Sequence, residues 1–209
     1  MNKLSKSFHR NLLEDYLRRY CYLIKGNILD IGSKNRRYDH LFQGKITAID
    51  IRPNLGKNII DGNLIDLKFD SNQFDSIICL EVFEYLEPND FQKGFNEILK
   101  VLKKGGKAII TIPFYYADHQ DRIRFTHGFI SDYLSQENKF KFSSFKFGNK
   151  YTAIYDMIRN KIIQFKSKLI RVLLRITILR LCYSIMRFFS LDKREDEFYS
   201  GIFIVCTKK

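Results

Sequence analysis

The sequence predicts an α/β fold with a doubly wound, mostly parallel sheet. Short apolar runs of strand length alternate with longer segments of helical period. The clearest run lies in 27–35, where Asp30 ends the apolar stretch and Gly32 starts a turn; the next run ends at Asp50. Ligands of such sheets bind at the carboxyl ends of the strands. We therefore expect one rim to hold Asp30, Gly32, Asp50, Leu80 and Pro113.

Residues 1–80 supply the first expected elements. Apolar side chains in 4–23 recur at helical spacing, which predicts an N-terminal helix. A loop rich in Asp and Asn precedes the last strand of this part. The expected strands are 28–31, 45–51, 58–60 and 76–80, and a helix is expected over 36–42.

The next expected helix is opened by 88–90. An acid lies near its N-terminus, and lysines follow at Lys100 and 103–104, as the helix dipole prefers. We expect 105–106, two glycines, to end this helix in the left-handed conformation that glycine adopts easily. The remaining expected elements are a strand over 107–112, a helix over 126–136, a strand over 140–147, two helical pieces within 151–190 and a closing strand over 198–206.

The positive charge is concentrated in one segment. Between Lys141 and Arg187 there are eleven Lys or Arg and a single acid, Asp156, so this segment carries ten of the thirteen net charges. The basicity therefore belongs to one surface. Within 169–189 the longest uncharged run is six residues, whereas a membrane-spanning helix needs ~20. We expect no transmembrane segment.

The cysteines and acids indicate a cytoplasmic protein without a metal. The four cysteines show no metal-ligand spacing, which favours free thiols in a reducing compartment. Residues 1–10 lack the apolar stretch of a secretory signal. The acids of 61–75 lie in a turn-rich segment, which favours a solvated loop over a metal site.

The turn after the first strand discriminates between ligands. A dinucleotide site uses three glycines, so that a pyrophosphate can sit at a helix N-terminus. Here Gly32 is followed by Ser33, Lys34 and Asn35. A carboxylate at Asp50 suits both hydroxyls of a ribose. The pattern favours an adenosine ligand without pyrophosphate, such as S-adenosylmethionine.

Several motifs in the order and spacing of one family cover roughly residues 26–135. They are 28–33, Asp50, 74–85, 98–106 and 110–114. On these motifs the chain resembles class I S-adenosylmethionine-dependent methyltransferases. Residues 113–116, with His119, Asp121 and 124–126, resemble more narrowly a bacterial group associated with cell-surface polysaccharide biosynthesis.

The resemblance implies a seven-stranded Rossmann-like sheet, methyl transfer (EC 2.1.1.-) and S-adenosylmethionine as the cofactor. It also implies roles for individual residues. Asp30, Gly32 and Ser33 would line the methionine part, Asp50 would bind the ribose, Ile51 and Leu64 would sandwich the adenine, Asp61 or Asn63 would lie near its amino group, and Leu80 and Glu81 would flank the sulfonium.

Two positions depart from the family pattern. Lys34 stands where a second glycine is usual, and Tyr85 stands where a histidine commonly follows Glu84. Lys34 would crowd or repel a cationic cofactor. It is the basis for an alternative in which the protein is a binding module that keeps the fold but has lost turnover.

The candidate catalytic residues lie shortly after 113–116. Methyl transfer mainly needs alignment and exclusion of water, and a base helps when the acceptor is a hydroxyl. His119 beside Asp121 is the candidate base, and Arg124 is the candidate anchor for an acidic or phosphorylated acceptor. The alternative is a surface ion pair between Asp121 and Arg124 beside a solvated histidine.

The basic segment 157–190 allows three interpretations. A helical wheel gives it an apolar stripe with basic borders, which favours an interfacial helix on an anionic membrane. The alternatives are an insertion packed on its own sheet and a nucleic-acid surface. Base-methylating enzymes carry an Asn-Pro-Pro-Tyr type of motif after the fourth strand, whereas 80–83 reads Leu-Glu-Val-Phe. The stripe comprises Ile158, Ile162, Phe165, Leu169, Val172, Leu173 and Ile176.

We expect one methyltransferase domain over 1–209. Its parts are an N-terminal helix (1–25), a cofactor-binding core (26–150), a basic amphipathic helical insertion (151–192) and a closing strand (196–209). The main hypothesis is an enzyme that O-methylates a glycan or a lipid-linked small acceptor at the cytoplasmic membrane face. The alternatives are the inactive binding module and an RNA methyltransferase that uses the basic helices.

Overall fold

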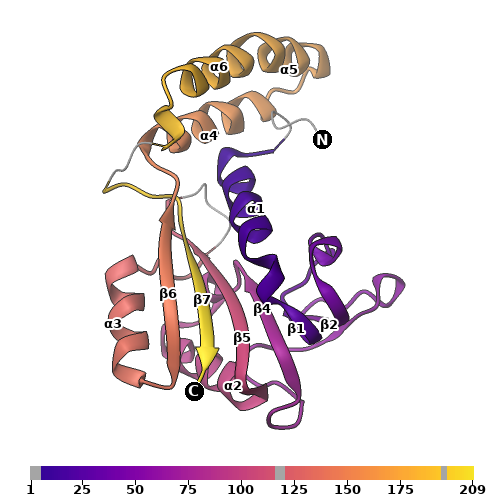
Figure 1. Ribbon diagram of the computed structural model, residues 1–209. Coiled ribbons are helices and arrows are strands. Elements are labelled where there is room, and N and C mark those ends of the chain that lie inside the picture. Colours follow the sequence, from indigo (N-terminus) through magenta and orange to yellow (C-terminus); the bar gives the residue numbers. More distant parts are fainter. Residues whose placement is uncertain (1–5, 116–120, 194–196) are drawn as a thin grey trace.

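The computed structural model describes residues 6–115, 121–193 and 197–209. At its centre is a seven-stranded sheet of order β3-β2-β1-β4-β5-β7-β6, in which β7 runs antiparallel to both its neighbours (Figure 1). The other pairings are parallel, so the predicted fold class is confirmed. The strands are β1 (Lys25–Ile31), β2 (Gln43–Asp50), β3 (Ile59–Asp61), β4 (Phe74–Leu80), β5 (Leu102–Pro113), β6 (Phe140–Phe147) and β7 (Gly201–Lys208).

Helices cover both faces of the sheet. Successive side chains of a strand point to opposite faces, so Ile28 and Leu29 of β1 lie in different apolar layers. On one face α1 (Phe8–Tyr20) packs its buried leucines beside Ile28. On the other face α2 (Phe91–Val101) and α3 (His127–Glu137) pack beside Leu29. This core fixes the strand ends that build the site.

Several predicted elements are confirmed. Strand β6 coincides with the predicted 140–147, and α3 falls on the helix predicted over 126–136. Thr126 caps α3, since its side chain accepts a hydrogen bond from the N–H of Phe129. The closing strand begins at Gly201 and lies inside the sheet, between β5 and β6.

The helix predicted over 36–42 is wrong. After β1 the chain forms turns and one short 3-10 helix, η3 (Asp39–Leu41). Lys34 and Arg36 have φ angles of 51° and 53°, a left-handed conformation that an α-helix cannot contain. The Arg36 guanidinium donates to the backbone carbonyl of Asn58 at 3.1 Å, which ties this turn to the segment before β3.

The predicted end of the second helix is also wrong. Helix α2 ends at Val101, and β5 begins at the next residue. Gly105 has a φ of 74°, the left-handed angle expected of it. However, it lies within β5, where the register of the β4–β5 pairing shifts, and not at the end of a helix. Lys103 therefore lies in a strand, where its Nζ pairs with the carboxylate of Asp75 at 2.7 Å.

A helical unit stands between β6 and β7, at the carboxyl end of the parallel strands (Figure 1). It therefore caps the edge of the sheet where ligands of this fold bind. It packs on the start of α1 through the buried Phe8, Tyr155, Ile162, Leu179 and Met186. The unit consists of α4 (Lys150–Ile163), α5 (Lys168–Leu174), a π-helical turn (Arg175–Leu179) and α6 (Arg180–Phe188), so the expected helical character of 151–190 is confirmed.

The carboxylate of Asp156 fastens this unit to α1. Its two oxygens accept hydrogen bonds from the backbone N–H groups of Phe8, at 2.6 Å, and His9, at 2.9 Å. These N–H groups belong to the first turn of α1, which has no partners for them within the helix and carries the positive end of the helix dipole. Burial raises the pKa of Asp156, and the two N–H groups lower it. The single acid of the basic segment is thus a structural link.

We predict that Asp156→Ala lowers the free energy of unfolding by about 1–3 kcal/mol, because two buried N–H groups lose their acceptor. Urea denaturation measures the loss. Asp156→Asn keeps one acceptor oxygen and should lose less. Asp70→Ala, which removes an exposed loop acid, is the control and should leave the transition unchanged. Identical transitions for Asp156→Ala and the parent protein would contradict the prediction.

Candidate active site

The turn after β1 is held tightly against the ends of β2 and β4. The N–H groups of Gly32 and Ser33 both donate to the carbonyl of Ile49, at 2.9 and 3.0 Å. Gly32 has a φ of 71°, and a Cβ at this position would lie 2.4 Å from Cγ2 of Val82. Both the backbone angle and the space therefore require glycine here.

Asp30 presents a carboxyl at the end of β1. Burial raises its pKa to about 6, and the Ser33 hydroxyl acts in the opposite direction. The Ser33 hydroxyl is itself buried and has no hydrogen-bond partner among the described residues. A desolvated carboxylate beside an unpartnered hydroxyl is suited to a cationic, hydrogen-bonding group of a ligand.

Asp50 is fixed at the end of β2 by two backbone amides. Its Oδ2 accepts from the N–H of Lys34 and its Oδ1 from the N–H of Arg52, both at 2.9 Å. Each carboxylate oxygen keeps a second acceptor position, so the group can still bind two hydroxyls of a ligand. The carboxylate is thus oriented before any ligand arrives.

The residues predicted to surround an adenine differ in their exposure. Ile51 directly follows Asp50 and is 67% exposed, so it offers an uncovered apolar side chain at this edge. Leu64 is buried in the core instead. Asp61 and Asn63 are exposed, and the side-chain oxygen of Asn63 accepts from the N–H of Ile65 at 3.2 Å.

Lys34 adopts the backbone conformation that a glycine would adopt here. Its φ is 51°, its side chain is exposed, and its N–H orients Asp50. A left-handed conformation in a non-glycine residue costs of the order of 1–3 kcal/mol. The turn therefore keeps its shape without the second glycine, at a cost in stability.

We predict that Lys34→Gly raises the free energy of unfolding by up to about 1 kcal/mol, because relief of the left-handed strain exceeds the added chain entropy. Lys45→Gly is the matched control. Lys45 is an exposed strand lysine without a positive φ, so this change should lower stability by about 0.5–1 kcal/mol. Chemical denaturation of both variants checks the opposite signs, and a loss in both would contradict the prediction.

A histidine from α1 reaches the end of β4. Nε2 of His9 lies 2.5 Å from Oε1 of Glu81. Glu81 has a φ of 57° and donates its N–H to the carbonyl of Thr111 at 2.9 Å. The imidazole is buried, with its ring centroid 5.0 Å from that of Phe147. The sequence analysis missed His9, since no local pattern marks it.

Glu84 carries a second buried carboxyl near this strand end. The residue is 2% exposed, and its Oε2 has no hydrogen-bond partner among the described residues. Burial, followed by the nearby charge of Glu81, raises its pKa to about 9, so the group is protonated at neutral pH. Its backbone carbonyl accepts from the N–H groups of Arg122, at 2.8 Å, and Ile123, at 3.2 Å. Glu84 thereby anchors the chain just before α3.

We predict that Glu84 makes the protein less stable as the pH rises. Between about pH 5 and 9 the folded state keeps a proton that the unfolded state has released. The free energy of unfolding of the parent protein should therefore fall relative to Glu84→Gln by up to about 1.4 kcal/mol per pH unit, and the difference should level off above pH 9. Urea denaturation across this range measures it. The control is Glu87→Gln, at an exposed neighbour, whose free energy of unfolding should change with pH as that of the parent does. If the free energy of unfolding of Glu84→Gln also changes with pH as that of the parent does, the raised pKa of Glu84 is refuted.

The structure brings two of the three predicted catalytic residues together. Asp121 and Arg124 form an ion pair, and Arg124 also donates to the backbone carbonyl of Phe114. His119 lies outside the described residues. The segment after β5 also reaches the helical unit, since the Tyr115 hydroxyl lies 3.9 Å from Sδ of Met157 in α4. The catalytic roles of these residues remain predictions.

Metal-binding geometry is not found in the part of the chain that the structure describes. Within those residues no group of three or more His, Cys, Asp and Glu side chains is placed to hold an ion. The four cysteines are free, and Cys79 and Cys206 are buried. Burial raises the pKa of both these thiols, Cys206 to about 12, so neither is a reactive thiolate.

Comparison with known proteins agrees with this geometry. Residues 29–110 match the family model described as a methyltransferase domain. This stretch runs from β1 into β5 and includes Asp30, Gly32, Asp50 and Glu81. This match bears out the predicted class of enzyme, a methyltransferase, over these residues.

The similar solved structures match nearly the whole chain. A SAM-dependent methyltransferase from Archaeoglobus fulgidus is 15% identical with a TM-score of 0.61, over 96% of this chain and 94% of that one. Phosphoethanolamine N-methyltransferase 2 from Haemonchus contortus, in complex with S-adenosyl-L-methionine, is 15% identical with a TM-score of 0.60, over 96% of this chain and 52% of that one. These likenesses establish the fold.

One curated relative matches over a short stretch. An uncharacterized protein from Methanocaldococcus jannaschii is 36% identical over 53 residues, which are 25% of this chain and 22% of that protein. The match thus spans about a fifth of the relative's length.

Proposed function

We propose that this methyltransferase domain transfers the methyl group of S-adenosylmethionine to a hydroxyl of a glycan or a lipid-linked small acceptor at the cytoplasmic face of the membrane. The observation that carries the proposal is the row of polar groups along the carboxyl edge. In this proposal Asp30, Ser33 and Asp50 bind the cofactor, and Glu81 and Glu84, which follow β4, lie where the sulfonium would meet the acceptor.

The residues present fit this cofactor. Asp30 and the Ser33 hydroxyl would bind the ammonium of the methionine part. Burial disfavours the ionised form of Asp30, and the positive charge of the bound ammonium would stabilise that form. Asp50, oriented by Lys34 and Arg52, would accept hydrogen bonds from both ribose hydroxyls. Ile51 would cover one face of the adenine. When bound, the cofactor supplies an electrophilic methyl on its sulfonium.

On the acceptor side, this chain's residues have to position the hydroxyl and take its proton. Glu81, held by His9, is a carboxylate at the end of β4 that can receive the proton. His119 with Asp121 remains the predicted base. The exposed rings of Tyr85 and Tyr115 flank the same edge, and their apolar faces with polar tips suit a sugar ring.

The two alternatives have less support. The inactive module rests on Lys34, but this side chain is exposed and its backbone orients Asp50. The RNA methyltransferase rests on the basic helices, but their outer surface is largely branched aliphatic and aromatic. Among the described residues, no helix is long and apolar enough to cross a membrane. The membrane location we propose is peripheral.

We predict that cofactor binding depends on an ionised Asp30. The affinity for S-adenosylmethionine should fall below about pH 6, by up to about tenfold per pH unit, because Asp30 must lose its proton to pair with the ammonium. Titration calorimetry measures this. S-adenosylhomocysteine carries the same ammonium and should show the same profile. Asp30→Asn should bind weakly with a flatter profile, and Asp66→Asn, at an exposed loop acid, should match the parent. Absence of binding of either compound to the parent protein would sink the proposal.

The acceptor is tested by methyl transfer. Purified protein, with S-adenosylmethionine carrying a labelled methyl, is incubated with a lipid-linked glycan fraction, with free oligosaccharides and with RNA. Label in either carbohydrate fraction supports the proposal. Label in RNA alone supports the nucleic-acid alternative, and cofactor binding without label in any fraction supports the inactive module.

A further inference from the structure

The outer face of α5, the π-helical turn and α6 is an uncovered apolar surface. Leu169 is 79% exposed, Leu181 is 61% exposed and Phe188 is 82% exposed. Soluble proteins rarely leave such side chains clustered and uncovered. We call the exposed apolar residues of 169–189 the outer face. They are Leu169, Ile170, Val172, Leu173, Ile176, Ile178, Leu181, Ile185, Phe188 and Phe189.

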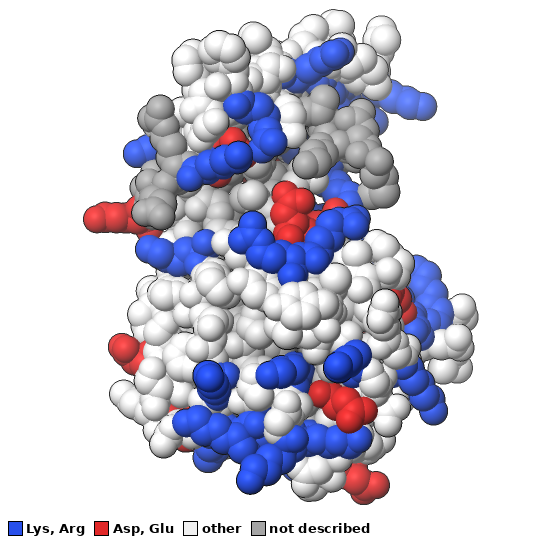
Figure 2. Space-filling model, in the orientation of Figure 1, with Lys and Arg blue, Asp and Glu red and all other residues white. Residues whose placement is uncertain are grey.

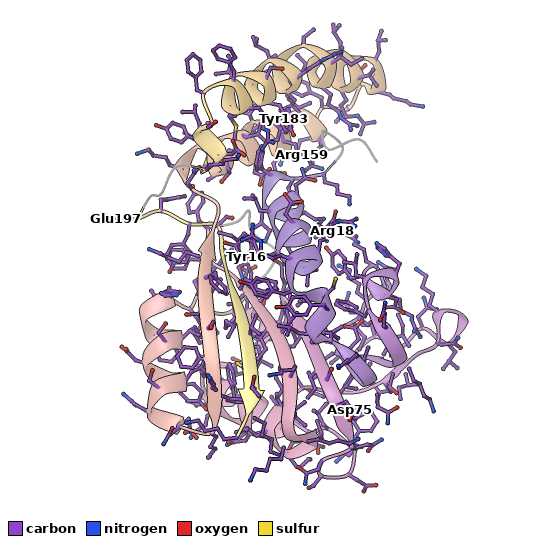
Figure 3. All side chains as sticks on the ribbon, viewed as in Figure 1. Tyr16, Arg18, Asp75, Arg159, Tyr183 and Glu197 are labelled. Carbon is purple, nitrogen blue, oxygen red and sulfur yellow. The ribbon has the colours of Figure 1, made fainter. Side chains whose placement is uncertain are left out.

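The inner side of the same helices is fully used in packing. Leu179 and Met186 are buried against Phe8 and Tyr155, and Tyr183 lies between α6 and α4 (Figure 3). The apolar stripe expected from the sequence is therefore divided. Ile158 and Ile162 of α4 face inward, whereas the stripe residues of α5 and the π-helical turn are exposed, namely Leu169, Val172, Leu173 and Ile176. The residues of the outer face thus take no part in the packing of the helical unit on α1.

Basic residues border the outer face. Lys166, Lys168, Arg180 and Arg187 are exposed, and Arg171 and Arg175 are partly exposed. In Figure 2 the upper part of the molecule shows a largely white surface interrupted by blue Lys and Arg. The described acids of the helical unit are engaged, since Asp156 binds the start of α1 and Asp192 pairs with Arg187 at 2.6 Å. The surface therefore combines apolar area with net positive charge.

We propose that the outer face docks on an anionic lipid bilayer and brings the carboxyl edge of the sheet to the membrane surface. Apolar side chains can enter the boundary between headgroups and acyl chains, while the basic border contacts anionic headgroups. A second copy of the chain is a poorer occupant, because a symmetric dimer would place the two basic borders together. RNA offers phosphates for the border but little for the aliphatic centre.

Docking would also select the acceptor. Two helix layers, α5–α6 and α4, separate the outer face from the carboxyl edge (Figure 1). At a helix diameter of about 10 Å this places the strand ends roughly 20 Å from the lipid surface. A lipid with an extended head, such as a lipid-linked oligosaccharide, reaches that far, and a small phospholipid headgroup does not. This selection rests on the proposed function, whereas the docking does not.

The test is co-sedimentation with two kinds of vesicle, phosphatidylcholine with phosphatidylglycerol and phosphatidylcholine alone. The parent protein should sediment with the anionic vesicles only, and less at high salt. The quadruple variant Leu169→Ser, Leu173→Ser, Leu181→Ser, Phe188→Ser should bind at least about tenfold more weakly. Its matched control is Tyr22→Ser with Leu55→Ser, two exposed apolar residues elsewhere, and it should bind like the parent.

A charge series completes the test. Neutralising Lys166, Lys168, Arg171 and Arg175 to Gln should weaken binding about a hundredfold, since each basic residue near an anionic surface contributes several-fold. The control neutralises Lys25, Lys45, Lys104 and Lys141, exposed lysines at or near the opposite edge of the sheet, the edge that Asp75 marks in Figure 3. Equal loss in the two charge variants would reduce the effect to net charge and overturn the proposal.

Three further results would overturn the docking proposal. Absence of sedimentation of the parent with anionic vesicles overturns the proposal, as does a dimer in solution that the apolar variant abolishes. Salt-sensitive RNA binding without vesicle binding overturns it too. Cofactor affinity, measured by calorimetry on every variant, should stay unchanged. Loss of vesicle binding with intact cofactor binding therefore separates failure of docking from failure of the proposed function.

Discussion

The hydrogen bonds from the first turn of α1 to the Asp156 carboxylate hold the site together. They join the helical unit to α1, and the same His9 whose N–H they engage sends its imidazole to Glu81. A helix start, a helix of the insertion and the end of β4 are thereby fixed relative to one another. Loosening this contact would therefore release both the helical unit, which caps the carboxyl edge, and the side chain of Glu81, which His9 holds at that edge.

The carboxyl edge carries a cost in stability that packing alone would not require. Asp30, Glu84 and Asp156 are carboxyls whose pKa burial raises, and Lys34 and Glu81 hold left-handed backbone angles. Such features persist where function needs them, and the apolar core on both faces of the sheet supplies the compensating stability. Asp30, Lys34, Glu81 and Glu84 lie at this edge of the sheet, and Asp156 holds the helical unit above it, which is why we propose the edge as the active site.

Local patterns in the sequence predict the sheet and the turn that follows β1. Strand β6 is predicted because Phe alternates with Lys and Ser, and the turn at Gly32 because a glycine follows a buried strand. The helix expected over 36–42 fails because Arg36 takes a left-handed backbone angle and its guanidinium binds the carbonyl of Asn58, 22 residues away. His9 escapes prediction for the same reason, since its carboxylate partner lies 72 residues further on.

Strands β6 and β7 are neighbours from Phe140↔Lys208 to Phe147↔Gly201, so the whole helical unit is the loop of a single antiparallel hairpin. Closing a loop of roughly fifty residues, compared with a tight turn of four, costs only about 2 kcal/mol more chain entropy. The unit enters and leaves the sheet at two adjacent strand ends. Insertions, exchanges or deletions there leave the strand order intact. If the helical unit docks on a membrane as we propose, the part that sets the location of the protein can therefore diverge in evolution independently of the sheet.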